Sequence, residues 1–268
     1  MATPDSITHP FASFAAQMAD ASGKAIMQHY RQPLRADSKG AAGAFDPVTV
    51  ADRAAEMAIR DMIEQRWPGH GIIGEEYGTT RADAEYIWVI DPIDGTRAFM
   101  SGIPTWGTLI GLLHHGEPVL GLLDQPHLGE RFIGDMKGTM RTGQRGEAPL
   151  KTRQGVRLAD ACIWVSSTIT TRPAMFASLQ RLAPQVRMLR YGSDCISMAM
   201  LAEGHIDAVI ETGLEIYDIA AQVPIVTGAG GIITALDGSA PLSAGSILAA
   251  GDPGLHMAIR ATMNGAGR

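Results

Sequence analysis

The chain has 268 residues, with 28 acidic side chains against 22 basic ones, a formal net charge of −6 and a hydrophobic fraction of 46%. This length can form one large domain or two modest ones, and the hydrophobic fraction excludes a disordered chain. The acidic excess argues against a nucleic-acid-binding protein, which needs a basic face to neutralise phosphates. It does not exclude a small phosphorylated ligand, because bound metal ions invert the local field.

Two cysteines, Cys162 and Cys195, are too few for a disulfide framework or a cysteine-built zinc site. The first residues lack the basic and apolar regions of a signal peptide. No apolar run approaches the roughly 20 residues that a membrane span needs. We therefore expect a cytoplasmic protein with no membrane and no nucleic-acid partner.

In the first half of the chain, hydrophobic periodicity predicts helices over residues 7–31 and 50–67, the second ending at Pro68-Gly69. Apolar runs predict strands over 71–74 and 86–90, then a short helix over 96–100 and a hairpin of 108–113 with 118–123. In the hairpin turn, His114 and His115 should point apart, as neighbours in a strand do, and form no metal site. The expected stripe of the second helix comprises Ala54, Met57, Ala58, Asp61 and Met62.

The second half alternates strands with helices. Strands are predicted over 161–166, 187–191, 206–211, 231–235 and 246–250, and helices over 173–182, 193–203, 218–228 and 253–263. This alternation is typical of a layered α/β structure. A composition shift over 151–160 divides the chain into halves 1–150 and 151–268, which we expect to pack as one unit.

The most informative stretch is Trp-Val-Ile-Asp-Pro-Ile-Asp-Gly-Thr at 88–96, where an apolar strand delivers Asp91 and then Asp94. Two close carboxylates repel each other unless a cation lies between them, and oxygen-only ligands suit Mg²⁺ or Mn²⁺. Gly95 permits close approach to a ligand, and free N–H groups where a helix starts at Thr96 could hold a phosphate. The alternative is that Asp-Pro and Asp-Gly are simple turn dipeptides.

Three further acidic positions have ordinary structural explanations when taken singly. Glu75 follows a strand and could be a solvated turn residue, while Asp52 and Asp218 could cap helices. The ordered set is more specific than any member.

The series Asp-Pro-Val-Thr-x-Ala-Asp at 46–52, Gly-Glu-Glu at 74–76, the stretch at 88–96 and aromatic-Asp-x-Ala-Ala at 217–221 resembles the inositol monophosphatase family. The resemblance covers nearly the whole chain. It implies an αβαβα sandwich and a lithium-sensitive, Mg²⁺-dependent phosphatase that forms a homodimer. Within the family, the segments 105–111, 118–126 and 129–134 resemble the histidinol-phosphate phosphatase branch.

By matching position, the resemblance implies two or three Mg²⁺ ions per site, with Mn²⁺ as a substitute. The implied first metal has Glu75, Asp91 and the Ile93 carbonyl as ligands, and the second has Asp91, Asp94 and Asp218. A looser third ion would be held by Glu75 through water. The implied water-positioning pair is Thr96 with Asp52, and the N–H groups of Gly95 and Thr96 would receive the phosphate.

A cationic substrate amine needs carboxylate partners, for which Asp194, Glu211 and Glu215 are candidates. Glu211 could instead be a strand-end surface charge and Glu215 an exposed loop residue. Glu215-Ile216 departs from the Lys-Pro of the branch pattern, which affects only the substrate assignment. Lys39, in an insertion over 38–44, could approach the rim of the site, or it could be a solvated side chain.

The sequence thus predicts a phosphomonoesterase that prefers histidinol phosphate and acts in histidine biosynthesis by attack of metal-activated water. The first alternative is an inositol-1-phosphate or broad sugar-phosphate phosphatase. The second, of a different class, is a non-catalytic protein that binds a phosphorylated metabolite; the presence of all implied ligands and of Thr96 disfavours it.

Overall fold

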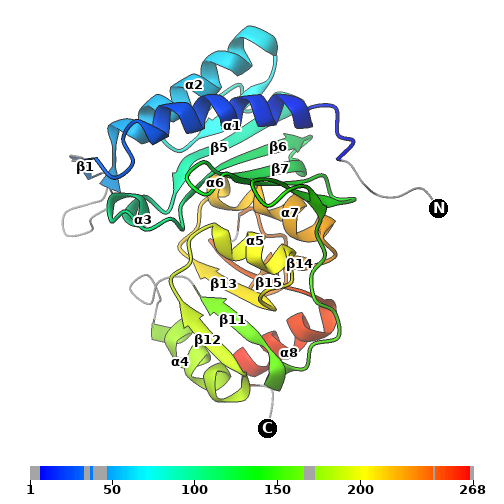
Figure 1. The fold of residues 1–268 in the computed structure, drawn as a ribbon. Helices are drawn as coiled ribbons and strands as arrows, with labels where there is room; N and C mark the ends of the chain where they lie inside the picture. Colours follow the sequence, from blue (N-terminus) through cyan, green and yellow to red (C-terminus); the bar gives the residue numbers. More distant parts are fainter. Residues whose placement is uncertain (1–6, 33–36, 39–46, 166–172, 244, 266–268) are drawn as a thin grey trace.

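The structure, a computed structural model, describes residues 7–32, 37–38, 47–165, 173–243 and 245–265. These residues form five layers in the order αβαβα, which confirms the predicted fold class (Figure 1). Within them no helix combines the length and the apolar character that crossing a membrane requires. Of the predicted insertion over 38–44, all but Ser38 lies outside the described residues.

Helices α1 (Ala12–Met27) and α2 (Val50–Arg66) form the outer layer on the first sheet. The predicted inner stripe of α2 is wrong: Ala54 and Met57 are exposed, and Glu56 is fully buried. The inward face differs from the prediction because the buried charged residues Glu56 and Arg60 have hydrogen-bond partners. The face that packs inward comprises Ala51, Asp52, Ala55, Glu56, Ile59, Arg60 and Ile63.

The first sheet has eight strands in the order β10-β9-β8-β7-β6-β5-β3-β4. Its strands are antiparallel except for β3 and β5, which run parallel. The predicted hairpin is β6–β7, and the short helix α3 (Thr96–Met100) follows β5. The strand bounds are β3 Gly71–Gly74, β4 Gly78–Thr80, β5 Tyr86–Asp94, β6 Gly107–His114, β7 Glu117–Gln125, β8 Glu130–Gly134, β9 Thr139–Gly143 and β10 Ala148–Pro149.

The middle layer contains α5 (Ile196–Ala202), α6 (Ile216–Ile219) and α7 (Gln222–Gly228). The single helix predicted over 218–228 is therefore wrong, because the chain bends at Ala220-Ala221 between α6 and α7. This bend presses against glycines of the first sheet: a Cβ on Gly121 would lie 1.8 Å from the Ala221 carbonyl oxygen, and one on Gly111 3.0 Å from Ala220. The Ala-Ala pair thus sets the distance between helix layer and sheet.

The second sheet has five strands in the order β12-β11-β13-β15-β14, with β12, β11 and β13 parallel. Helices α4 (Pro173–Leu182) and α8 (Pro253–Met263) cover its outer face. The remaining strands are β1 Asp37–Ser38, β2 Pro47–Val48, β11 Cys162–Val165, β12 Met188–Tyr191, β13 Ala208–Thr212, β14 Ile232–Ala235 and β15 Ser246–Ala250, with 3₁₀ turns η1 Leu158–Asp160 and η2 Ala183–Gln185.

We retain the halves 1–150 and 151–268 as a proposal. The first sheet ends at Pro149 and the second begins at Cys162. One core cluster joins Leu109, Leu123 and Phe132 of the first sheet with Cys195 and Ile225 from the middle layer. The two sheets are thus packed on a shared layer of helices.

The turn between β6 and β7 differs from the prediction in one respect. His115 and Gly116 have positive φ values of 51° and 83°, as in the two-residue type I′ turn. Because His115 is in the left-handed region and not in a strand, its ring does not point away from that of His114. The ring centroids lie 4.3 Å apart, so the predicted divergence is wrong.

Candidate active site

Asp91 and Asp94 lie at the carboxyl end of β5, an internal strand of the first sheet. In a regular strand, residues three positions apart point to opposite faces. Here Asp91 pairs with Leu109 and Asp94 with Gly107, so β5 has one extra residue at this point, a β-bulge. The bulge brings both carboxylates to one side, where oxygens of Asp91, Asp94 and Asp218 all lie within 4.8 Å of one another.

The chain turns sharply after Asp94. Gly95 has a φ of 86°, in the left-handed region, and a Cβ at this position would lie 2.9 Å from the side chain of Asp194. Helix α3 starts at Thr96, whose hydroxyl donates a hydrogen bond to the Ile93 carbonyl over 3.2 Å. The predicted short helix is confirmed, and glycine is required at 95 both by φ and by space.

Glu75 follows β3 directly and lies beside the acidic cluster. Its charge contributes to raising the pKa of Asp52, Asp91 and Asp218. Its position is fixed by the backbone on both sides. Its own N–H donates to the Ile90 carbonyl over 3.2 Å, and the next N–H, of Glu76, donates to Glu56 of α2 over 2.7 Å.

Asp52 is buried at the start of α2, where it also completes a capping box. Its Oδ2 accepts hydrogen bonds from the Thr49 backbone N–H over 2.8 Å and from the Thr49 hydroxyl. Burial raises its pKa, the Thr49 bonds oppose this, and the charge of Glu75 adds to the increase. The capping role considered from sequence is present, together with proximity to Glu75.

Asp218 is the third residue of α6 and forms a capping box with Glu215. Its Oδ2 accepts the Glu215 backbone N–H over 2.7 Å, and the Glu215 side chain accepts the Asp218 N–H. Burial raises the pKa of Asp218 to about 7, with Glu75 among the contributing charges. Glu215 is exposed and serves here as the residue that begins α6.

The electrostatics of the cluster indicate a cation site. Burial and then the charges of Glu75, Asp94 and Asp218 raise the pKa of Asp91 well above its usual range. Burial and then Asp218, Asp194 and Glu211 do the same for Asp94. Oδ1 of Asp91 is buried without a hydrogen-bond partner. A buried, unpaired carboxylate oxygen among other carboxylates fits a hard divalent ion, so the donor set is compatible with Mg²⁺.

Two substrate-selecting candidates, Asp194 and Glu211, lie against this cluster. Asp194 accepts a hydrogen bond from the Thr105 hydroxyl, and the following N–H, of Cys195, donates to Asp94 Oδ2 over 2.6 Å. Glu211 accepts from the Ser197 hydroxyl over 3.0 Å, and burial raises its pKa to about 8. Glu211 is thus a buried carboxyl and not the surface charge considered as an alternative.

Sequence reasoning missed the residues that hold the site in place. Glu56, fully buried on α2, accepts hydrogen bonds from the N–H groups of Glu76 and Tyr77 and from Arg60 Nε over 2.7 Å. The spacing of Glu56 and Arg60 at i and i+4 is a usable signal for a pair, though not for its burial. Nothing in the sequence pattern pointed to Thr105 or Ser197 as partners of acidic residues.

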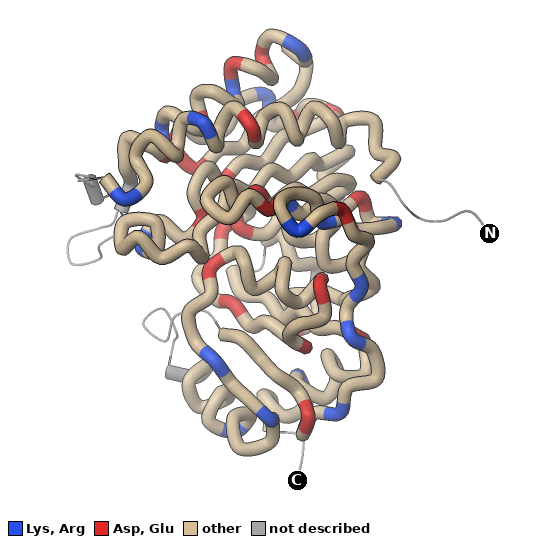
Figure 2. The backbone as a smooth tube through the Cα atoms, viewed as in Figure 1, with Lys and Arg blue, Asp and Glu red and all other residues tan. Residues whose placement is uncertain are grey.

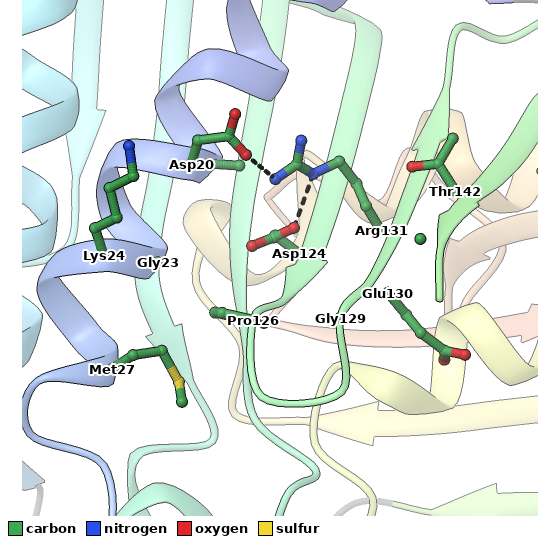
Figure 3. Close-up of a pocket in the computed structure, with 12 residues that line it drawn as sticks. Asp20, Gly23, Lys24, Met27, Asp124, Pro126, Gly129, Glu130, Arg131 and Thr142 are labelled. Atoms are coloured by element: carbon green, nitrogen blue, oxygen red, sulfur yellow. Dashed lines mark hydrogen bonds and ion pairs between the residues drawn. The ribbon is translucent and has the colours of Figure 1, made fainter. Parts of the chain in front are cut away.

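A pocket of about 530 Å³ lies elsewhere, between α1 and the strands β7–β9 (Figure 3). Arg131 in its wall donates to Asp124 over 2.8 Å and to Asp20 over 2.7 Å. These two carboxylates neutralise the Arg131 guanidinium, so the pocket wall does not offer an unpaired cation to an anionic ligand. None of the clustered carboxylates lines it. Figure 2 likewise shows basic residues interspersed with acidic ones over the described chain, without a continuous basic face in that view.

Comparison with known proteins agrees with the site's geometry. The sequence model of the inositol monophosphatase family matches residues 8–267. The chain is 41% identical over 262 residues to the chloroplastic bifunctional phosphatase IMPL2 of Arabidopsis thaliana, covering 92% of this chain and 72% of that protein. It is 34% identical over 219 residues to a histidinol-phosphatase of Mycobacterium tuberculosis, covering 81% and 83%.

A solved structure shows the same fold. An inositol monophosphatase from Zymomonas mobilis superposes with a TM-score of 0.84 at 37% identity, covering 96% of this chain and 99% of that one. The relatives thus include proteins named for two different substrates.

Proposed function

The chain belongs to the inositol monophosphatase family and is a phosphatase, and on this premise we propose that it is a Mg²⁺-dependent phosphomonoesterase that prefers L-histidinol phosphate. The observation that carries the metal dependence is the Asp91–Asp94–Asp218 cluster, with its buried and unpartnered Asp91 oxygen. The small phosphorylated substrate would bind beside this cluster, at the carboxyl end of β5.

The proposed ligands of two or three Mg²⁺ ions are Glu75, Asp91, the Ile93 carbonyl, Asp94 and Asp218, with Mn²⁺ as a substitute. Bound divalent ions supply charge stabilisation and an activated water for in-line displacement at phosphorus. The role of the protein is to hold carboxylates that repel one another at short range. The bulge in β5, the capping box of α6 and the N–H of Cys195 perform this task.

Thr96 and Asp52 are proposed to position the attacking water. The Thr96 hydroxyl donates to the Ile93 carbonyl, so the lone pairs of the Thr96 hydroxyl oxygen can accept a hydrogen bond from that water. Asp52, which accepts a hydrogen bond from the Thr49 backbone N–H, would help to orient the Thr96 hydroxyl through its negative charge. The N–H groups of Gly95 and Thr96 are proposed to bind the phosphate oxygens.

The preference for histidinol phosphate is supported by excess carboxylate at the substrate side. Asp194 and Glu211 lie close enough to Asp94 to raise its pKa, and Glu211 is buried. A substrate ammonium would find a charge partner there, whereas the hydroxyls of inositol need donors and acceptors in equal measure. Glu215, exposed at the start of α6, is proposed as a peripheral acceptor.

The alternative substrate is inositol-1-phosphate or a broader set of sugar phosphates, supported by the 37% identity to the Zymomonas mobilis inositol monophosphatase. Phosphate release from L-histidinol phosphate, inositol-1-phosphate and fructose-1,6-bisphosphate, each with Mg²⁺, separates these possibilities. We expect the highest kcat/KM for histidinol phosphate. Equal or better turnover of inositol-1-phosphate would overturn the preference.

Cytoplasmic location, a role in histidine biosynthesis, inhibition by lithium and a homodimeric state complete the proposal. Light scattering coupled to size exclusion tests the dimer, which predicts twice the 28.4 kDa mass of one chain. Li⁺ titration against Mg²⁺ tests the inhibition, for which we expect lower turnover as Li⁺ rises.

A further inference from the structure

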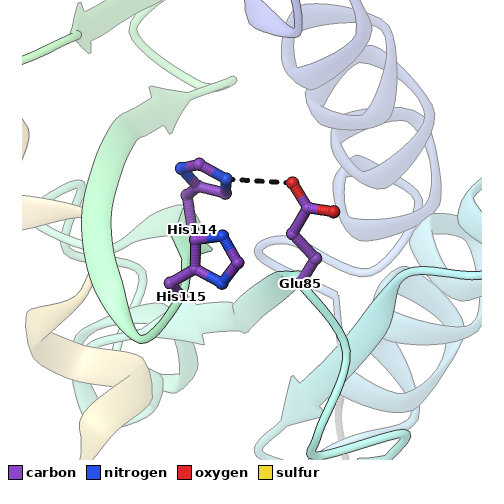
Figure 4. Close-up of side chains that lie close together, drawn as sticks. All are labelled: Glu85, His114 and His115. Carbon is purple, nitrogen blue, oxygen red and sulfur yellow. Dashed lines mark hydrogen bonds and ion pairs between the residues drawn. The ribbon is translucent and has the colours of Figure 1, made fainter.

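A second group of metal-ligating side chains lies at the opposite end of β5. The side chains of Glu85, His114 and His115 each place one ligand atom within 4.8 Å of the other two (Figure 4). Glu85 directly precedes β5, so the group lies six residues before Asp91, or about 20 Å away along an extended strand. It is therefore separate from the acidic cluster, and it contains imidazoles where that cluster has only oxygens.

Backbone structure holds the two histidines and the glutamate together. The His115 N–H donates to the Glu85 carbonyl over 2.9 Å, and Tyr86 pairs with His114 across the β5–β6 ladder. The type I′ turn then places the His115 ring beside that of His114. The three side chains thus come from two segments that are fixed to each other by main-chain hydrogen bonds.

The His114 ring is also oriented by aromatic packing. It stacks on Tyr86 with centroids 4.5 Å apart and planes 14° apart, and Tyr86 stacks in turn on His70. With its face covered by Tyr86, the ring directs Nε2 at Glu85 Oε1, 3.1 Å away. Two ligands of a tetrahedral zinc ion, at bond lengths of 2.0–2.1 Å, lie about 3.3 Å apart. The existing separation is close to that value.

We propose that Glu85, His114 and His115 bind a Zn²⁺-type divalent ion at the surface of the first sheet. Imidazole nitrogens favour zinc and its neighbours in the first transition series over Mg²⁺, so the two sites differ in selectivity. Glu85 and His115 are exposed and His114 is half-buried, so water can complete the coordination. The ion ties the segment before β5 to the β6–β7 turn and stabilises the folded state by an amount that increases with the logarithm of the free zinc concentration above the Kd.

One proposed ligand, His115, can be replaced without disturbing the turn that carries it. In His115→Asn the imidazole is lost, while asparagine followed by Gly116 is the residue pair that a type I′ turn prefers. Glu85→Gln removes the carboxylate charge at an exposed position and serves as a second, independent variant. His205→Asn is the matched control, because His205 is exposed and pairs with Glu203 in a different part of the chain.

Equilibrium dialysis of the full chain against Zn²⁺, in excess Mg²⁺ to occupy the acidic cluster, tests the site. We expect wild type and His205→Asn to bind one more equivalent of zinc than His115→Asn and Glu85→Gln, or to bind it at least about tenfold more tightly, as loss of even an outer-shell partner costs 10–100-fold. Zinc should raise the melting temperature of wild type by more than that of either variant.

Equal zinc stoichiometry and affinity in all four proteins would overturn the proposal. So would a loss in His205→Asn as large as in His115→Asn, since it would show unspecific binding to surface imidazoles. Far-ultraviolet circular dichroism of the metal-free proteins checks that each variant is folded. Phosphatase activity with Mg²⁺ should be unchanged in His115→Asn and in Glu85→Gln.

Discussion

The backbone N–H of Cys195 donates a hydrogen bond to Oδ2 of Asp94 over 2.6 Å, joining residues that are 101 positions apart in the chain. Asp94 ends a strand of the first sheet, and Cys195 precedes the first turn of α5 in the middle layer. A carboxylate that accepts a main-chain N–H keeps its orientation without using a side-chain cation. The acidic cluster thus depends on both halves of the chain.

Asp91→Asn separates the fold from metal binding. The amide keeps the shape of the carboxyl but removes a buried charge that other acids repel. We expect the metal-free variant to melt at the same temperature as wild type or above it. Mg²⁺ should raise the melting temperature of wild type and leave that of the variant unchanged. Equal stabilisation of both by Mg²⁺, measured by differential scanning calorimetry, would place the ion elsewhere.

The metal-free protein should lose stability as pH rises. Burial raises the pKa of Asp218 to about 7 and of Glu211 to about 8, above the value near 4 of unfolded carboxyls. Between these limits the folded state binds more protons than the unfolded state, so the free energy of unfolding decreases from about pH 4 to about pH 8.

Thermal melts of EDTA-treated protein across this range measure the effect. Mg²⁺ should reduce it, because the ion favours the ionised carboxylates, and Glu211→Gln should remove part of it. A melting temperature that rises across the same pH range without metal would be inconsistent with the buried, repelling carboxyls.

Gly95→Ala should damage the site more than the fold. The left-handed region costs a non-glycine residue about 1–2 kcal/mol, and the new Cβ would also lie 2.9 Å from Asp194. Gly146→Ala is the control, since Gly146 has a similar φ of 80° with no atom within 4 Å of the added Cβ. We expect a loss of unfolding free energy in urea in both variants, larger in Gly95→Ala because of the added contact, and a fall in kcat of at least about tenfold only in Gly95→Ala. Unchanged kcat in Gly95→Ala would show that Gly95 and Asp194 do not position the reacting groups.

Glu211→Gln should change substrate preference. If the buried carboxylate pairs with an ammonium, its loss costs about 1.5–3 kcal/mol of binding, or roughly 10–100-fold in KM for L-histidinol phosphate. The KM for inositol-1-phosphate should change less. Glu215→Gln, at an exposed position that retains its capping acceptor, should have a small effect on both. Equal KM changes for the two substrates in Glu211→Gln would argue for a structural role.

Apolar periodicity was sufficient to predict most elements, among them the boundaries of α4, α8 and β15. It failed on the inward face of α2, where Glu56 and Arg60 are buried because they pair with each other. Glu56 also accepts a backbone N–H, and Arg60 donates to the Gly78 carbonyl. It also failed at Ala220-Ala221, because the bend between α6 and α7 depends on Gly111 and Gly121 in another layer. Such contacts are set by tertiary structure.

The candidate active site was likewise predicted only in part, because some of its features depend on tertiary contacts. The ordered acidic motifs identified Asp91, Asp94 and Asp218, which the structure brings within 4.8 Å of one another. The bulge that turns Asp94 toward Asp91 was not predicted, since it arises from pairing with β6. The partners Thr105 and Ser197 are ordinary hydroxyl residues, distinguished only by what lies opposite them.

Phosphate release from L-histidinol phosphate, followed at neutral pH in wild type with Mg²⁺, in wild type with EDTA and in Asp91→Asn with Mg²⁺, tests the central claim most directly. We predict turnover in the first case and a decrease of at least about 10³-fold in the other two. Metal ions supply several kcal/mol of charge stabilisation in the transition state, and each 1.36 kcal/mol changes the rate about tenfold. Turnover that persists with EDTA or in Asp91→Asn would contradict a metal-dependent phosphatase centred on Asp91.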